Sequence, residues 1–120
     1  MLIVVRHGRT EANAAGLLLG RTDPPLDERG RTQALALAGA VADPDGVDRV
    51  VASPLRRARE TAECLGMPVE VDDRWIELDY GRYDGLATDA VPAETWAAWR
   101  SDPAFRPPGG ESLAELGSRV

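Results

Sequence analysis

The sequence contains no lysine, and all 14 of its basic residues are arginine. Without lysine, the chain cannot form a Walker A loop, a Schiff-base lysine or the lysine linkage of a pyridoxal-phosphate enzyme. Arginine by itself still suits the bidentate capture of phosphate or carboxylate groups. The missing lysine therefore excludes several classes of enzyme and leaves anion-binding chemistry open.

Histidine and cysteine each occur once, as His7 and Cys64. A single cysteine excludes an internal disulfide framework and fits a reducing compartment, and one histidine with one cysteine cannot form a zinc constellation. No apolar run approaches membrane-spanning length, and no signal-peptide pattern precedes the first predicted strand. The paired carboxylates of Asp43-Pro44-Asp45 resemble a metal site, but they follow a predicted helix end rather than a strand. We therefore expect a cytoplasmic protein without a metal site and without membrane association.

Basic charge is also scarce, with 14 basic residues against 20 acidic ones and a formal charge of −6. A chain with no basic excess is a poor general partner for the phosphates of nucleic acid. A length of 120 residues supports one domain that buries more than half of its unfolded surface. These features predict a single domain over residues 1–120.

Apolar runs and helix signals alternate along the chain. Leu2–Val5 is short, β-branched and unbroken, so it predicts a buried strand, and 47–52 and 69–71 predict two more. Asp27 predicts a helix cap, followed by an apolar side and an end at Asp43-Pro44. Ser53-Pro54 predicts a second helix start, and Pro92 a third. The order strand–helix–strand–helix–strand predicts an α/β layered sheet with flanking helices.

The apolar side of the first of these helices is predicted at Leu35, Leu37, Ala38 and Val41. Trp75 and Ile76 are predicted anchors of an irregular segment, and Trp96 and Trp99 are predicted packing residues. Pro107–Gly110 predicts a sharp turn.

The last element is interrupted. Ser112 and Glu115 form a capping-box pattern, so they predict a helix, yet the sequence stops at Val120 after barely two turns. We expect a domain that is incomplete at its C-terminus. Its uncovered apolar faces and strand edge predict a chain that is poorly stable by itself or self-associates.

Arg6-His7-Gly8 follows the first predicted strand directly, which places an imidazole and a guanidinium at the edge where ligands bind in α/β sheets. Further segments follow in order: Asn13, Gly20–Leu26, Ser53–Ala62, Glu77 and Pro108–Ser112. Together these segments resemble the histidine phosphatase superfamily, which contains phosphoglycerate mutases and many broad phosphatases. The resemblance covers essentially all 120 residues.

The resemblance implies a phosphoglycerate mutase-like fold and a reaction through a phosphohistidine. A neutral imidazole is a good nucleophile toward phosphorus, and preorganised positive donors stabilise the charge that develops on the phosphoryl oxygens. A position in the first turn of a helix also favours an anion. The implied roles are nucleophile for His7, general acid for Glu77, phosphate clamps for Arg6 and Arg57, hydrogen-bond donors for Thr10 and Asn13, and room for the phosphate at Gly8.

The resemblance further implies a small phosphorylated metabolite as substrate and no cofactor. It leaves phosphatase and mutase outcomes open. Near Glu77, the carboxylates of Glu70 and Asp79 are alternatives for the role of acid. Asn13, Arg21 and Gln33 have the alternative of being polar groups of a loop or a helix surface.

Members of the family carry a second catalytic histidine late in the chain, and nothing after His7 supplies one here. The sequence therefore predicts either the amino-terminal portion of a longer enzyme, or a phosphate-binding module or fragment that does not turn over substrate.

Overall fold

The computed structural model describes residues 1–41 and 46–120, and these form two compact units. The first unit comprises Met1–Glu11 and Asp23–Trp75, and the second comprises Ala12–Thr22 and Ile76–Val120. The helices and strands, in chain order, are α1 (Glu11–Ala14), α2 (Glu28–Val41), β1 (Val50–Ala52), α3 (Arg56–Glu63), β2 (Val69–Val71), the 3-10 turns η1 (Asp73–Trp75), η2 (Gly81–Tyr83) and η3 (Thr88–Ala90), α4 (Ala93–Ser101) and α5 (Leu113–Arg119).

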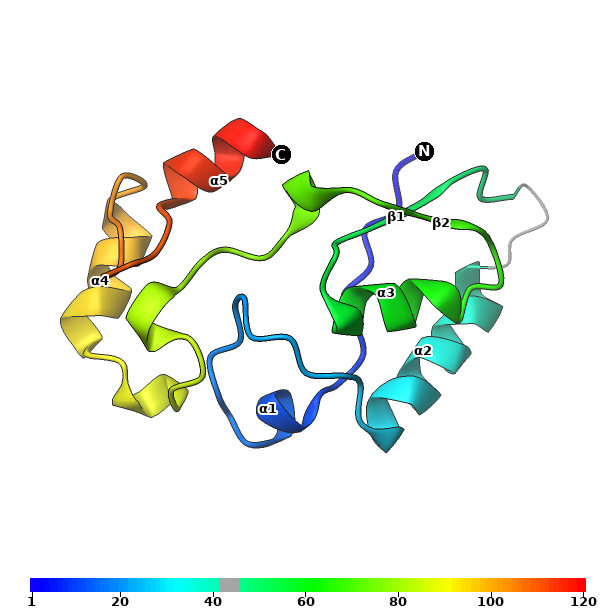
Figure 1. Ribbon diagram of the computed structural model, residues 1–120, viewed down its shortest axis with the longest axis horizontal. Helices are drawn as coiled ribbons and strands as arrows, with labels where there is room; N and C mark the ends of the chain where they lie inside the picture. The colour runs from blue at the N-terminus through cyan, green and yellow to red at the C-terminus, as the bar shows by residue number, and fades with distance from the viewer. Residues whose placement is uncertain (42–45) are drawn as a thin grey trace. The chain divides into compact units, whose positions relative to one another are not determined.

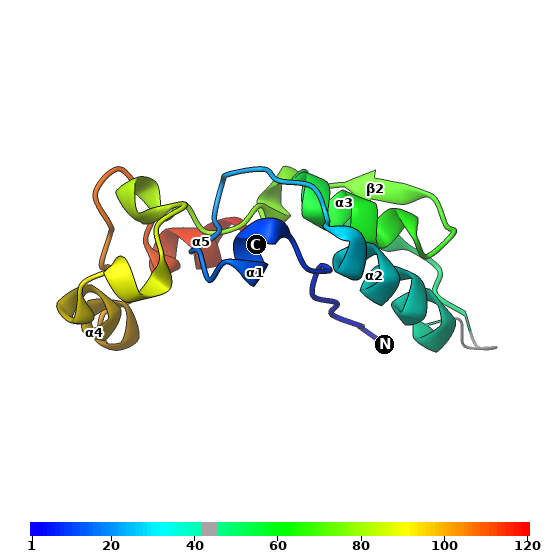
Figure 2. The same cartoon turned by 90° about the horizontal axis from the view of Figure 1, so that it is seen from below.

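The first unit has an α/β arrangement. β1 and β2 pair in parallel with Val50 opposite Val69, and α3 lies between this strand pair and α2 (Figures 1 and 2). Val50 and Ala52 are buried against Ala62 of α3, because alternate residues of a strand point to the same face. The α/β class predicted from the sequence is confirmed, and the two strands fall within the predicted ranges.

The predicted first strand, Leu2–Val5, is wrong. These residues pair with no strand in the part of the chain that the structure describes, and Leu2 and Val4 are each 81% exposed. A β-branched run favours extended backbone, but a strand also needs a neighbour that accepts and donates its ladder hydrogen bonds. Among the described residues, β1 and β2 pair only with each other, so the apolar run has no such neighbour there.

Helix α2 begins as the sequence predicts. Asp27 accepts a 2.7 Å hydrogen bond from the backbone N–H of Gly30, the usual geometry of a helix N-cap. That N–H, followed by the Arg9 guanidinium, lowers the pKa of the Asp27 carboxyl despite an opposing desolvation cost. The predicted end at Asp43-Pro44, with the carboxylates of Asp43-Pro44-Asp45, lies outside the described residues.

The apolar side of α2 differs from the prediction. Gly30 and Ala34 are its buried residues, Leu37, Ala38 and Val41 are half-buried, and Leu35 is 63% exposed. A side chain at Gly30 would clash with the carbonyl oxygen of Arg9. The close approach of two backbones therefore decides which side of α2 faces inward, and apolar periodicity cannot reveal such an approach.

Helix α3 begins at Arg56, two residues later than Ser53-Pro54 predicts. The Ser53 hydroxyl accepts from the N–H of Leu55 instead. The carboxylate of Asp23 accepts the N–H of Arg56 at 2.6 Å. The acceptor at this helix start thus comes from a loop 33 positions earlier, which a local capping pattern does not contain.

The second unit is built around Trp99, which is 8% exposed. Leu18 and Val91 are buried with it, and four aromatic rings pack against it at centroid distances of 5.2–6.0 Å: Tyr80, Tyr83, Trp96 and Phe105. The packing role predicted for Trp96 and Trp99 is confirmed.

Trp75 and Ile76, the predicted anchors of the irregular segment, are not its most buried residues. In the first unit, Trp75 is 48% exposed, so its predicted role as an anchor is wrong. Ile76 is half-buried, and the deeply buried residue of this segment is Leu78, at 4% exposure. A large apolar side chain at a unit boundary is a weak guide to burial, because exposed apolar surface is common in folded proteins.

Two predicted features near the C-terminus are confirmed. The N–H of Gly110 donates to the carbonyl of Pro107, and Gly109 has a φ of 74°, which glycine adopts without strain. The Ser112 hydroxyl caps α5 by accepting the N–H of Glu115, and the Glu115 carboxylate accepts the N–H of Ser112, which completes the capping box.

Asp84 binds the loop at 20–22, which belongs to the same unit but lies more than sixty positions earlier in the sequence. Its carboxylate accepts the backbone N–H groups of Gly20, Arg21 and Thr22 at 2.8–2.9 Å. Burial opposes the charge of Asp84, but the hydrogen bonds from Gly20, Thr22 and Arg21 outweigh it and lower its pKa. The ionised carboxylate is therefore the form that the fold binds.

Substitutions at two glycines of α2 test the close approach of the α2 backbone to the backbone of Arg9. We expect Gly30→Ala to destabilise the protein by about 1–3 kcal/mol, because the added Cβ overpacks against the Arg9 backbone. Gly39→Ala is the matched control: its Cβ meets nothing within 4 Å, so it should stabilise α2 by about 0.5–1 kcal/mol. Urea unfolding measures both, and equal effects of the two substitutions would contradict the packing described here.

Asp84 predicts a pH-dependent contribution to stability. Because its folded pKa is lowered, the contribution is fully present above its unfolded pKa of about 3.9 and is lost as the pH falls through the folded value. At pH 7, Asp84→Asn should therefore cost about 1–3 kcal/mol in urea unfolding. The gap between the variant and the unmodified protein should close toward pH 2.

The control for this prediction is Asp89→Asn, because Asp89 is exposed. That substitution should change stability little at any pH. A gap for Asp84→Asn that stays constant down to pH 2 would show that its charge is not what the loop binds.

Candidate active site

The segment that carries His7 is held in place by its own backbone and by two helices. His7 is half-buried, and its Nδ1 lies 2.7 Å from the carbonyl oxygen of Gly8. A carbonyl only accepts hydrogen bonds, so we assign the ring proton to Nδ1, which places the lone pair on Nε2. The assigned tautomer carries its lone pair, which a nucleophile requires, on Nε2.

Gly8 is enclosed between α2 and α3. Its N–H donates to the hydroxyl of Thr61 on α3 at 2.9 Å, and a Cβ on Gly8 would clash with the carbonyl oxygen of Gly30 on α2. The sequence predicts glycine here to leave room for a phosphate. The structure supplies a separate reason, which is contact with the α2 backbone.

The residues after Gly8 are joined to the start of α2. The N–H of Arg9 donates to the Gln33 side chain at 3.0 Å, and its Nε donates to Asp27 at 2.6 Å. Asp27 in turn donates its own N–H to the Arg9 carbonyl. Thr10 is fully buried and forms a β-bridge with Leu26. Gln33 is thus part of the support of this segment.

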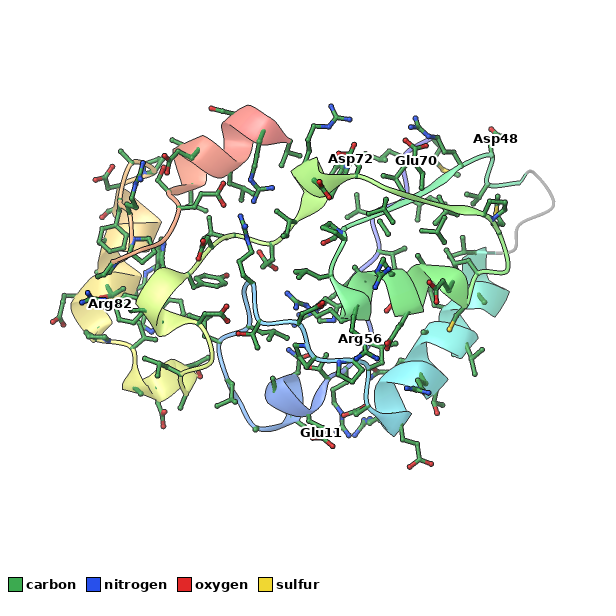
Figure 3. The ribbon with its side chains drawn as sticks, viewed as in Figure 1. Glu11, Asp48, Arg56, Glu70, Asp72 and Arg82 are labelled. Atoms are coloured by element: carbon green, nitrogen blue, oxygen red, sulfur yellow. The ribbon has the colours of Figure 1, made fainter. Side chains whose placement is uncertain are left out.

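Arg57 differs from the arginines beside it. It is 2% exposed, whereas Arg56 and Arg59 are exposed, and Arg56 pairs with Glu60 at 3.0 Å on the surface of α3 (Figure 3). Arginine is almost never fully buried unless it is paired. Its position in the first turn of α3 matches the prediction, although the N–H of Arg56 at that helix start is bound by Asp23.

The predicted site residues are divided between the two units. The first unit contains His7, Gly8, Thr10, Arg57 and the exposed Arg6. In this unit the backbone of Gly8 is hydrogen-bonded to α3. The second unit contains Asn13, in α1, and Glu77, both half-buried.

The backbone of Glu77 is fixed by arginines. Its carbonyl oxygen accepts from Nε of Arg21 at 2.7 Å, and the Arg119 guanidinium donates to the carbonyl of Ile76 at 2.7 Å. Glu111 pairs with Arg119 at 2.7 Å and with Arg21 at 3.5 Å. Arg119 is the main reason that the pKa of Glu111 is lowered. The sequence treats Arg21 as a loop polar group, but here it supports the predicted acid.

The two rival carboxylates are engaged elsewhere. Glu70 lies on β2 and binds Arg49 through both carboxylate oxygens, at 2.6 and 2.8 Å (Figure 3). Arg49 lowers the pKa of Glu70, which makes Glu70 a poor proton donor near neutral pH. Asp79 accepts the N–H of Gly81 at the start of η2. The Glu77 carboxylate likewise accepts a backbone N–H, that of Leu78 at 2.8 Å, so the family resemblance is what selects Glu77 over Asp79.

Sequence reasoning predicts Asp27 as a helix cap but misses its bond to Arg9, and it misses the supporting roles of Thr61, Gln33, Asp84, Glu111 and Arg119. Thr61 leaves a local signal, because it lies one helical turn after Arg57 on the same face. The bonds of Gln33 to Arg9, of Asp84 to Gly20 and of Arg119 to Ile76 join residues that are 24 to 64 positions apart, so they leave no local pattern.

The described residues contain no group of three or more histidine, cysteine, aspartate or glutamate side chains that would hold a metal ion. None of the helices in ranges 1–41 and 46–120 has the length and apolar character needed to cross a membrane.

The chain is similar to known phosphatases and to a phosphoglycerate mutase. A glucosyl-3-phosphoglycerate phosphatase of Mycolicibacterium vanbaalenii is 38% identical over 98% of this chain and 55% of its own length. Phosphoserine phosphatase 1 of Hydrogenobacter thermophilus is 38% identical over 99% of this chain and 60% of its own. The crystal structure of a phosphoglycerate mutase from Thermus thermophilus superposes with a TM-score of 0.82 at 36% identity, over 95% of this chain and 64% of that one.

The chain therefore spans little more than half the length of two of these relatives, and it spans 35% of some other curated relatives. The match itself runs nearly from end to end of this chain. The family model of the histidine phosphatase superfamily (branch 1) matches residues 2–120, and the chain belongs to that superfamily.

Proposed function

We propose that the protein carrying this chain removes or transfers the phosphoryl group of a small phosphorylated metabolite through a phosphohistidine on His7. The observation that carries the proposal is the joining of the His7 segment to the helix of the buried Arg57. The activities named for the relatives, two phosphatases and a mutase, support the same chemistry.

In the first step, Nε2 of His7 attacks the phosphorus of the monoester. A phosphorus–nitrogen bond forms as the bond to the ester oxygen breaks, and Glu77 donates a proton to the leaving alkoxide. Charge on the phosphoryl oxygens is stabilised by the guanidinium groups of Arg57 and Arg6, with hydrogen bonds from Thr10 and Asn13.

In the second step, water attacks the phosphohistidine. The Glu77 carboxylate accepts a proton from that water, the phosphorus–nitrogen bond breaks, and inorganic phosphate leaves with His7 neutral again. A mutase differs only in the acceptor, because it returns the phosphoryl group to a bound intermediate. The residues proposed here serve both outcomes, and neither step uses a metal or an organic cofactor.

The proposed setting is the cytoplasm, which the single cysteine supports. Cys64 donates its thiol hydrogen to the Glu60 carbonyl, as a structural cysteine does.

A second candidate function is a module that binds phosphate without turnover. It requires only the anion-binding groups of the first unit, where the backbone at Gly8 is joined to the helix of the buried Arg57. Both candidates use Arg6, His7 and Arg57, so the covalent intermediate separates them.

The first experiment traps that intermediate in the whole protein that carries this chain. Incubation with a phosphorus-labelled aryl phosphate and rapid denaturation should yield a phosphoenzyme that is labile in acid and stable in base. His7→Ala should abolish the label, because His7 is the proposed nucleophile. Binding of inorganic phosphate without any label would favour the binding module, and a label retained in His7→Ala would refute the assignment of the nucleophile.

The second experiment compares the catalytic effects of substituting three neighbouring arginines of α3. Arg57→Ala should cost about 2.7–4 kcal/mol of transition-state stabilisation, by analogy with the loss of an oxyanion-hole donor. Arg56→Ala and Arg59→Ala should change kcat/KM little, because both side chains are exposed on α3. Thermal unfolding of each variant accompanies the kinetics, and equal losses from Arg56→Ala and Arg57→Ala would show that the clamp is misassigned.

A further inference from the structure

The hydroxyl of Thr61 lies between two backbone groups of the first unit. Thr61 is 4% exposed, accepts the N–H of Gly8 at 2.9 Å and donates to the carbonyl of Arg57 at 2.6 Å. A hydroxyl has one hydrogen to donate and lone pairs to accept, so it makes both bonds at once. One buried atom thus joins the residue after the proposed nucleophile to the residue that carries the proposed clamp.

Helix geometry explains only one of these bonds. A threonine inside a helix commonly donates to the carbonyl four residues earlier, and that bond by itself carries no information about a site. The bond from Gly8 is different, because Gly8 lies 53 positions away and its N–H has no place in the α3 ladder. It fixes where the His7 segment lies along α3.

The contact on the other side of Gly8 strengthens this constraint. The backbone of Gly8 meets the carbonyl of Gly30 so closely that a Cβ has no room. The segment is therefore bounded by α2 on one side and tied to α3 by Thr61 on the other. Loss of the hydroxyl would leave a buried N–H without this partner and free the segment to shift along α3.

We propose that Thr61 is a positioning residue, which sets the place of His7 relative to Arg57 for phosphoryl transfer. The inference rests on the proposed function. Both bonds of its hydroxyl run to backbone groups, so it acts through His7 and Arg57. A displacement of about 1 Å between reacting groups costs about 100-fold in rate, which sets the size of the effect expected.

The test compares two substitutions in the whole protein that carries this chain. Thr61→Val removes the hydroxyl at similar volume, and Thr61→Ser keeps it. With an aryl phosphate, Thr61→Val should lower kcat about 100-fold with little change in KM, and it should slow phosphohistidine formation in rapid-quench experiments. Thr61→Ser should stay within a few-fold of the unmodified protein. Amide exchange of Gly8 should accelerate in the valine variant only.

Thr95→Val is the matched control. Thr95 is a buried threonine of α4 whose hydroxyl lies 3.3 Å from that of Tyr83 in the second unit. Its substitution removes a comparable buried hydroxyl, so it should lower thermal stability while leaving kcat unchanged. Thr61→Ala provides a second hydroxyl-free variant if valine prevents folding.

The outcomes separate the two proposals. Unchanged kcat in the hydroxyl-free variants, or equal losses in the serine and valine variants, would overturn the role of Thr61 while His7→Ala remains inactive. A label retained in His7→Ala would instead overturn the proposed function. The Gly8 exchange rates then still decide whether the hydroxyl bridge exists.

Discussion

The close approach of two backbones beside His7 is the constraint on which the first unit depends. Gly8 and Gly30 each lack the Cβ that would separate the His7 segment from α2, and Arg9 lies against Gly30 at the same place. Because these contacts are between main-chain atoms, they leave little freedom for adjustment. The hydrogen bonds of Asp27, Gln33 and Thr61 complete a frame around the segment. The site is thus supported mainly by rigid backbone.

Carboxylates in this acidic chain organise loops by accepting backbone N–H groups. Asp23 does so at the start of α3, Asp27 at the start of α2, and Asp84 for three successive residues of the second unit. Ionised acceptors form stronger hydrogen bonds than neutral ones, and loops have few other partners for their N–H groups. The excess of acidic residues is therefore partly structural.

Arginine does related work around Glu77. Arg21 and Arg119 each combine an ion pair to Glu111 with a hydrogen bond to the Glu77 segment, which the several donors of a planar guanidinium allow. A single lysine ammonium offers no such fork. The absence of lysine is consequently compatible with the anion-binding role predicted for Arg57 in one unit and with the arginine support of Glu77 in the other.

The sequence by itself determined the features that depend on neighbouring residues: the helix caps at Asp27 and Ser112, the strands around Val50 and Val69, and the family motifs. It also distinguished Arg57 from its neighbours through its position in the motif. Tertiary structure decided what depends on distant partners. Leu2–Val5 has strand-forming side chains, yet pairing requires a neighbouring strand. The N–H of Arg56 at the start of α3 is bound by Asp23, and the N–H of Gly8 is bound by Thr61 once α3 has packed against the His7 segment. These hydrogen bonds join residues that are 33 and 53 positions apart, so they leave no local pattern in the sequence.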